Sequence, residues 1–225
     1  MQMSNFSWRS SGRRKAIEAF FLFVVFYALN FLLLRYLPYW SAIERLGLPY
    51  VSDFIMTLVD VSTLLLLLYV MKKRHFDLSD KTLQKGLKTL VITGVMAFML
   101  ISANDYLYAY AIPTPPLGPL PFDDRLITFF IEFIIAVISG PIFEEVLFRG
   151  LLLKYVFADK PLIGIVVSSL LFVLAHPSID WTAYWYYGVP GVVLGLTYNY
   201  TKTIKVPICV HMALNLISHI QVKLL

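Results

Sequence analysis

The sequence predicts an all-α protein: a polytopic bundle of about seven transmembrane helices with its N-terminus in the cytoplasm. Three observations support this prediction, namely the composition, the lengths of the apolar segments and the placement of basic residues. Of the 225 residues, 59% are hydrophobic and 15% are charged, and the mean hydropathy is +0.73. Soluble domains contain about 45–50% apolar and about 25% charged residues. A soluble fold of this size cannot bury the excess, so we expect an integral membrane protein.

Seven apolar segments are candidates for membrane-spanning helices, since about 20 residues cross the hydrocarbon core of a bilayer. The first resembles a signal peptide, but its apolar part is too long and no small-residue cleavage site follows, so we expect it to remain as the first span. The segments are 16–37, 51–71, 86–109, 126–157, 161–176, 183–200 and 206–222.

The fourth segment is too long for one straight span. Gly140 and Pro141 mark a point where the helix can bend, because proline removes a backbone hydrogen bond. Either a new helix begins at Pro141, with Glu144 and Glu145 near its first turn, or one kinked helix continues. The proline-rich stretch YAIPTPPLGPLPFDD (110–124) before this segment predicts an extended loop.

Basic residues concentrate in alternate connections, as the positive-inside rule requires of a chain with a cytoplasmic N-terminus. They are Arg9, Arg13, Arg14 and Lys15 at the N-terminus, then Lys72, Lys73, Arg74, Lys81 and Lys85, then Lys154 and Lys160, then Lys202 and Lys205. The intervening connections are poorer and contain Arg45, then Arg125 beside Asp123 and Asp124, then Asp180 alone. The net charge of +5 therefore reflects topology and anionic headgroups, and we expect no nucleic-acid partner. The one cysteine, Cys209, excludes a disulfide within the chain.

Ionisable side chains inside a membrane are costly, so each is a functional hypothesis. In EEVLFR, Glu145 and Arg149 have i,i+4 spacing and can pair on one helix face. Glu144 is turned away by about 100° and is left without that partner. A desolvated carboxylate suits proton transfer near neutral pH. The alternative is an interhelical salt-bridge cluster.

Two later segments contain further polar motifs. In FVLAH, Phe172 and His176 have i,i+4 spacing, and alone this motif favours a packing role. In HMALN, His211 and Asn215 have the same spacing and need a polar partner across the bundle. His219 lies on roughly the same face, near the chain end, and we expect it at the membrane interface.

Asp53 and Asp60 also share a helix face. They are expected to pair with basic groups or to lie near headgroups, and the alternative is a pore or a proton path.

The three motifs follow in order on separate late segments, and together they resemble the CAAX-protease and bacteriocin-processing (CPBP, or Abi) family of intramembrane proteases. That family includes the type II CAAX prenyl endopeptidase. Its pattern is a glutamate pair followed by x-x-x-Arg, then Phe-x-x-x-His, then His-x-x-x-Asn or Asp, and no motif position departs from it here. The resemblance covers residues 126–222. We expect one membrane domain over 1–225, with a catalytic core over 126–222 and accessory spans over 1–125.

The resemblance implies a membrane-embedded endopeptidase. Glu144 would activate a water molecule as the general base, and His176 would help to hold that water. His211 and Asn215 would stabilise the oxyanion of the tetrahedral intermediate or bind a metal. The implied site residues are Glu144, Glu145, His176, His211 and Asn215, with Arg149 and Phe172 as structural support; Glu145 and Arg149 would hold the site together.

Glu144, His176 and His211 form a plausible zinc set. However, the chain has no H-E-x-x-H motif, which would place two histidine ligands and a base on one helix. We favour the alternative, a glutamate-activated water with amide and imidazole donors and no required cofactor. A cysteine nucleophile is not expected, because Cys209 and His211 face apart on a helix.

The depths of these residues differ along their helices. At about 1.5 Å per residue, Glu144 lies about 15 Å from Lys154, His176 about 24 Å from Lys160 and His211 about 9 Å from Lys205. Helix tilt, the bend at 140–141 or an inserted loop must compensate. We expect the residues to converge on one cavity that opens to the cytoplasmic side.

The expected substrate is a lipidated or otherwise membrane-associated peptide, met within the lipid bilayer. Prenylated tails, bacteriocin leaders and signalling peptides all fit the resemblance. The compact chain and its basic loops favour a bacterial plasma membrane. The alternatives are a non-catalytic membrane scaffold, such as an immunity or signalling protein on the same fold, and a small transporter, against which the lack of an internal repeat counts.

Overall fold

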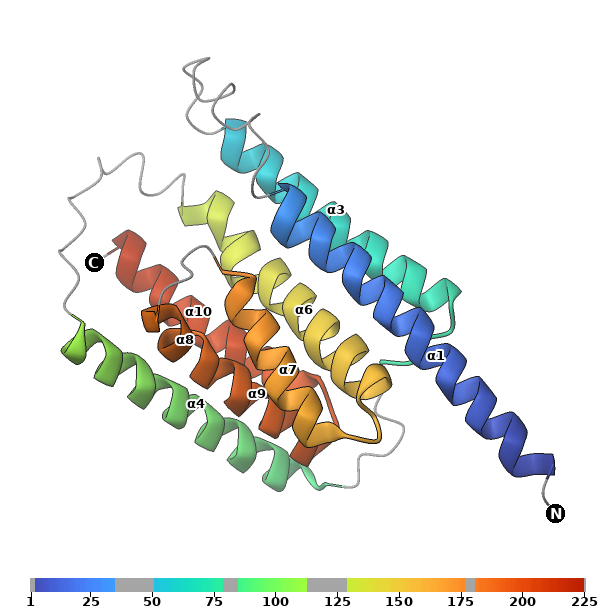
Figure 1. The fold of residues 1–225 in the computed structure, drawn as a ribbon. Coiled ribbons are helices and arrows are strands. Elements are labelled where there is room, and N and C mark those ends of the chain that lie inside the picture. Colours follow the sequence, from blue (N-terminus) through green and yellow to red (C-terminus); the bar gives the residue numbers. More distant parts are fainter. Residues whose placement is uncertain (1–2, 35–50, 79–84, 113–128, 177–180, 225) are drawn as a thin grey trace.

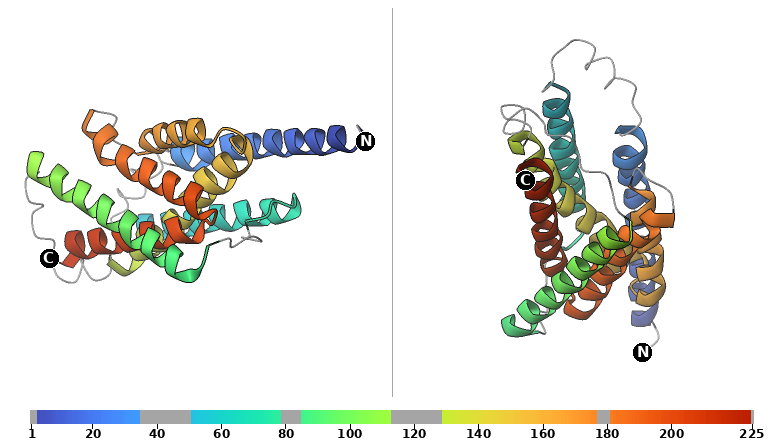
Figure 2. Two further views of the ribbon diagram at one scale, coloured as in Figure 1. Left: turned by 90° about the horizontal axis from the view of Figure 1, so that it is seen from below. Right: turned by 90° about the vertical axis from the view of Figure 1, so that its left-hand side faces the viewer.

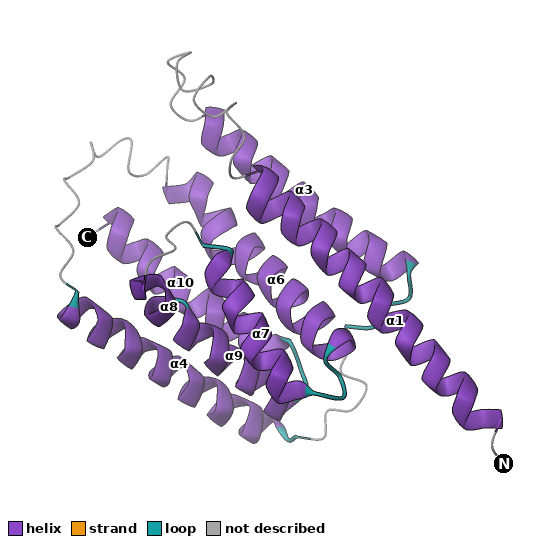
Figure 3. Cartoon of the chain, in the orientation of Figure 1, coloured by secondary structure: helices purple, strands orange, loops and turns teal. Residues whose placement is uncertain are grey.

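The computed structural model describes residues 3–34, 51–78, 85–112, 129–176 and 181–224, and every regular element in these ranges is a helix (Figures 1 and 3). The all-α class is therefore confirmed for this part of the chain. The helices are α1 (Met3–Tyr27) with a π-helical extension (Ala28–Leu34), α3 (Val51–Lys73), α4 (Leu87–Ala111), a long helix over 129–156, α7 (Pro161–Leu174), α8 (Trp181–Tyr186), α9 (Gly188–Thr201) and α10 (Lys205–Leu224).

The helices follow the predicted segments closely, with two differences. The first helix begins at Met3 rather than at residue 16. The segment 183–200 is divided, because α8 ends at Tyr186 and α9 begins at Gly188. Arg45, Lys81, Asp180 and residues 113–128, which include most of the proline-rich loop, lie outside the described residues.

Two described helices, Phe54–Lys73 and Leu87–Ala111, are long and apolar enough by length and composition to cross a membrane, and Pro161–Leu174 is a shorter apolar helix. Large apolar side chains project from the bundle on these helices; Leu65 is 60% exposed and Leu100 is 59% exposed. Water would disfavour such a surface, whereas lipid would cover it without cost.

The long helix over 129–156 resolves the two alternatives for the fourth segment, since the backbone remains helical through Gly140 and Pro141. It consists of a first turn (129–133), a π-helical stretch (Ile134–Ser139), α6 (Gly140–Glu145) and a second π-helical stretch (Val146–Val156). The continuous helix is therefore the one that forms. Glu144 and Glu145 lie in the middle of a helix and not at the start of a new one.

The wide π-helical turn accommodates the proline. Gly140 donates its backbone N–H to the carbonyl of Ile135, five residues back, and Pro141, which has no N–H, follows without leaving a donor unpaired. A Cβ atom at Gly140 would lie 2.7 Å from the Ile135 carbonyl oxygen. Only glycine fits this turn, and the turn sets the direction in which Glu144 projects.

The long helix is the centre of the bundle. It packs against α1, α3, α7 and α10, and more lightly against α9, whereas α4 packs on α9 and α10 at the far side (Figure 2). Its phenylalanine Phe148 is fully buried and meets Phe23, Tyr27 and Phe31 of the first helix and Phe172 of α7.

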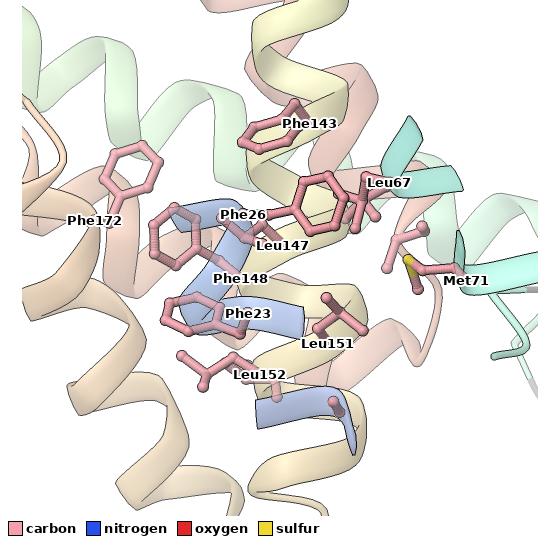
Figure 4. Packing of buried hydrophobic residues seen from close by; sticks show 14 of the residues in the cluster. Phe23, Phe26, Leu67, Met71, Phe143, Leu147, Phe148, Leu151, Leu152 and Phe172 are labelled. Carbon is pink, nitrogen blue, oxygen red and sulfur yellow. The ribbon is translucent and has the colours of Figure 1, made fainter. Parts of the chain in front are cut away.

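The buried core around it includes Phe23 and Phe26, Leu67 and Met71, Phe143, Leu147, Phe148, Leu151, Leu152 and Phe172 (Figure 4). The N-terminal helices are thus joined to the helices of the three motifs by one apolar core.

Candidate active site

Glu145 and Arg149 form a fully buried ion pair. Both side chains have 0% relative exposure, and Arg149 Nη1 lies 2.9 Å from Glu145 Oε1. The guanidinium also donates from Nη2 to the backbone carbonyl of Gly191 in α9, at 2.9 Å. This pairing follows the i,i+4 spacing of the sequence. It connects the long helix to α9 through a charge-assisted hydrogen bond.

The same carboxylate oxygen of Glu145 also binds His211 of α10, whose Nδ1 lies 3.0 Å from it. An ionised carboxylate only accepts hydrogen bonds, so Nδ1 of His211 is the donor. The neutral ring therefore has Nε2 as an acceptor, and Nε2 donates only from the cationic ring. Glu145 thus fixes the orientation of an imidazole that belongs to a different helix.

Glu144 faces the other nitrogen of that ring. Its Oε2 lies 3.8 Å from His211 Nε2, and within the described residues this buried oxygen has no hydrogen-bond donor. Glu144 also borders a cavity of about 380 Å³ whose wall includes His176, His211 and Asn215. The structure thus brings Glu144 and residues of both later motifs to one space, which is large enough to hold a peptide segment.

His176 lies just beyond the end of α7, at the cavity wall. Its Nδ1 is 2.7 Å from the carbonyl oxygen of Phe172, so Nδ1 donates and Nε2 is the acceptor nitrogen. The ring stacks on Tyr187 with centroids 3.8 Å apart. Phe172 is buried between His176 and His211, at 4.8 and 5.9 Å, and the Arg149 guanidinium lies 5.5 Å from its ring centre. This aromatic ring therefore packs against three charged or titratable groups of the site.

Asn215 is one turn beyond His211 on α10, and its amide is oriented by the long helix. Its Nδ2 donates to the carbonyl of Ala136 at 2.8 Å. Ala136 lies in the π-helical stretch, where the wider turn leaves carbonyls partly free of intrahelical partners. One amide proton is used in this contact, and the amide has a second one to donate.

A smaller cavity of about 160 Å³ lies behind Glu144 and Asn215, and its wall includes Asn30 and Asp60. Asn30 donates to Asp60 at 3.2 Å, so the partner of Asp60 is an amide and not the basic group expected from the sequence. Two residues of the N-terminal helices thus reach the candidate site. The side chain of Asp53 lies outside the described residues.

Sequence reasoning missed several contributors. His219, expected at the membrane interface, is buried; it binds the carbonyl of Phe129 at 3.0 Å and borders the larger cavity. Tyr187 and the Gly191 carbonyl were also not identified. The helix face that His219 shares with His211 and Asn215 could have identified His219 as a site residue. Tyr187 and Gly191 belong to no polar pattern in the sequence.

The opening of the cavity to the basic, cytoplasmic side stays a prediction, and several wall residues lie far from the basic connections. The wall residues Asp105, Tyr186 and Ser218 belong to the ends of α4, α8 and α10 that lie away from the basic connections. The cavity therefore extends toward the opposite end of the bundle. Glu144, His176 and His211 border one cavity although they lie at different points along their helices: Glu144 is in the middle of the long helix, His176 lies just beyond the end of α7 and His211 is in the second turn of α10.

The proposed zinc set is not assembled. Among the residues that the structure describes, no three Asp, Glu, His or Cys side chains are close enough together to share a metal ion. Glu144 and His211 face each other, but His176 is held apart by its contacts with Phe172 and Tyr187.

Comparisons with known proteins agree with the motifs. Residues 126–217 match the model of the Rce1-like family, described as type II CAAX prenyl endopeptidase Rce1-like. The chain is also similar to the membrane-embedded CAAX protease MroQ of Staphylococcus aureus (strain USA300), with 29% identity over 209 residues, which are 86% of this chain and 83% of the relative. No solved structure matches the chain.

All seven motif residues lie within the matched range 126–217. The family match, the relative and the assembly of the three motifs around one cavity agree: over residues 126–217 the chain is similar to the membrane proteases of the type II CAAX prenyl endopeptidase (Rce1-like) family.

Proposed function

We propose that the chain is an intramembrane endopeptidase that hydrolyses peptide bonds with a water activated by Glu144. The observation that supports this most directly is the position of Glu144, whose buried Oε2 lacks a hydrogen-bond donor within the described residues and lies 3.8 Å from His211 Nε2 at the wall of a 380 Å³ cavity. A carboxylate in this position has an acceptor oxygen available for a water molecule and is shielded from bulk solvent.

In the proposed reaction, Glu144 takes a proton from the water as its oxygen attacks the carbonyl carbon of the peptide bond. His176 accepts a hydrogen bond from that water and so directs its lone pair. The negative charge moves to the carbonyl oxygen, where the second amide proton of Asn215 stabilises it, joined by the Nε2–H of His211 in the protonated form of that ring. The C–N bond then breaks, and Glu144 gives its proton to the leaving amine.

Glu145 and Arg149 act as positioning residues in this scheme. Neither borders the cavity, and the contact of Glu145 with His211 Nδ1 keeps Nε2 pointing at the reaction centre. The scheme requires no metal, and the finding that no three acidic, histidine or cysteine side chains among the described residues could share a metal ion supports that choice.

We also propose that the protein spans the plasma membrane of a bacterium about seven times, with its N-terminus in the cytoplasm. Alternating basic connections support the orientation, and the termini of the described chain lie at opposite ends of the bundle, as an odd number of spans requires (Figure 1). The substrate is a peptide associated with the membrane.

Replacement of Glu144 by Gln tests the function. It keeps the size of the side chain and removes the base, so the abundance of the cleaved peptides should fall by about 10²–10⁴-fold while the protein accumulates normally in membranes. Glu18→Gln, at an acid on the first helix that pairs with Arg14 outside the cavity, is the matched control. Cells with Glu144→Gln and an unchanged membrane peptidome would instead support a non-catalytic scaffold.

A further inference from the structure

The cavity runs from the middle of the bundle toward the end that is remote from the basic connections. About 20 Å of helix separates Lys205 from Ser218 in α10, and about 25 Å separates Lys88 from Asp105 in α4. Ser218 and Asp105 are both wall residues. The same holds for His176, at the far end of α7 from Lys160. Most wall residues lie in the halves of their helices that face away from the basic ends, whereas His211 in the second turn of α10 and Glu144 in the middle of the long helix form the inner end of the cavity.

Exposed aromatic residues surround this remote end. Tyr106 and Tyr110 in the last turns of α4 are 74% and 81% exposed, and Trp181 at the start of α8 is 69% exposed. Tyrosine and tryptophan are enriched at the interface between a bilayer and water, because their apolar rings contact lipid while their polar atoms form hydrogen bonds with water and headgroups. Their positions indicate that the remote end lies at a membrane surface, with the cavity just inside it.

The charges of the cavity wall select among peptides. The wall has three carboxylates, Asp105, Glu132 and Glu144, and no lysine or arginine occurs among the wall residues that the structure describes. It also has three histidines, His176, His211 and His219, so the carboxylates outnumber the one imidazole that the proposed reaction uses in its protonated form. The fully buried Arg149 is directed toward Glu145 and Gly191 instead. An acidic cavity with apolar walls attracts cationic groups and repels anionic ones.

We propose that the active site takes its substrate from the extracytoplasmic face of the membrane and accepts a peptide segment with basic or neutral side chains near the cleaved bond. The basic ends of the helices belong in the cytoplasm, so the cavity opens on the other side. The substrate class is then a secreted or membrane-anchored peptide with its cleavage site outside, and not a cytoplasmic tail. The identity of the ligand as a peptide rests on the proposed function; the face and the charge of the cavity do not.

Cysteine labelling tests the face directly, because Cys209 is the only cysteine and can be replaced by serine. In the Cys209→Ser background, Ser218→Cys places a thiol on the exposed cavity wall, and Lys202→Cys places one at an exposed position of the basic end. A membrane-impermeant methanethiosulfonate added to intact cells should modify Ser218→Cys, whereas Lys202→Cys should react only after permeabilisation. The reverse pattern would overturn the proposal.

The same thiol tests the charge. The experiment compares the rates at which a cationic and an anionic methanethiosulfonate modify Ser218→Cys, each divided by the rate of the same reagent with a small thiol in solution. The ratio of the cationic to the anionic normalised rate should exceed one. Adding Asp105→Asn should lower that ratio about threefold, as expected for one charge several ångströms away in a hydrated site. A ratio of one or less contradicts an acidic cavity. Labelling requires no catalysis, so a protein that labels as expected but cleaves nothing contradicts only the proposed function.

Discussion

His211 of α10 donates from Nδ1 to Glu145 of the long helix at 3.0 Å, on the same oxygen that Arg149 binds at 2.9 Å. One carboxylate oxygen therefore couples the orientation of an imidazole to a buried ion pair. The glutamate pair of the motif is divided between two tasks, since Glu145 holds the site together and Glu144, on the neighbouring face, borders the cavity.

Replacing Glu145 by Gln should destabilise the protein strongly, because the buried Arg149 would lose its counter-charge. Removal of one partner from a buried ion pair costs about 3–5 kcal/mol. We expect a clearly lower Tm in detergent than for Glu144→Gln, whose side chain is partly exposed and lies 3.8 Å from His211 Nε2. The double variant Glu145→Leu with Arg149→Met should regain stability but not cleavage. Equal Tm values for the two single Gln variants would contradict a structural role for Glu145.

Gly191→Ala should loosen the contact between α7 and α9. A Cβ atom at Gly191 would lie 3.1 Å from Ser169 Cα, so the helices must separate, and overpacking of this kind costs about 1–3 kcal/mol. The shift also moves the carbonyl that Arg149 binds. Gly188→Ala is the matched control, since its Cβ would meet only Val173 at an ordinary 3.8 Å. Thermal unfolding in detergent measures both, and similar Tm values would show that α9 can move away freely.

Much of this architecture could be predicted from the sequence, and the limits have physical causes. The i,i+4 spacing was enough to predict the Glu145–Arg149 ion pair, because both residues lie on one helix. The contact between Glu145 and His211 joins helices that are 66 residues apart in the chain, and no periodicity within one helix determines it. The order of the motifs indicated a shared site only through the family resemblance.

The bend in the long helix and the direction of the cavity illustrate the same limit. Gly140 and Pro141 indicated a bend but not its form, because the π-helical turn depends on a wider register that begins at Ile134. Loop charges could not locate the cavity along the helices, because they indicate the positions of the helix ends and not the part of the bundle in which side chains leave a space.

Removal of divalent metal ions should leave peptide cleavage unchanged within about twofold, since the proposed route uses Glu144 as the base and side-chain donors for the oxyanion. The experiment compares purified protein in detergent before and after dialysis against EDTA and against 1,10-phenanthroline, with a zinc protease in the same buffers as the positive control. Loss of activity that added zinc restores would replace the metal-independent scheme by one in which His176 moves toward Glu144 and His211.

Tyr187 should support peptide cleavage through its aromatic ring rather than through its hydroxyl group. The ring stacks on His176 at 3.8 Å and, together with the Phe172 carbonyl, holds the imidazole at the cavity wall. Tyr187→Ala removes that support and should lower kcat by about 10–100-fold with little change in KM, because a displaced water-binding group impairs orientation more than substrate binding. Tyr187→Phe keeps the stacked ring and should retain most of the activity. Equal losses in both variants would assign the effect to the hydroxyl group, and an active Tyr187→Ala would mean that His176 keeps its place without the stacked ring.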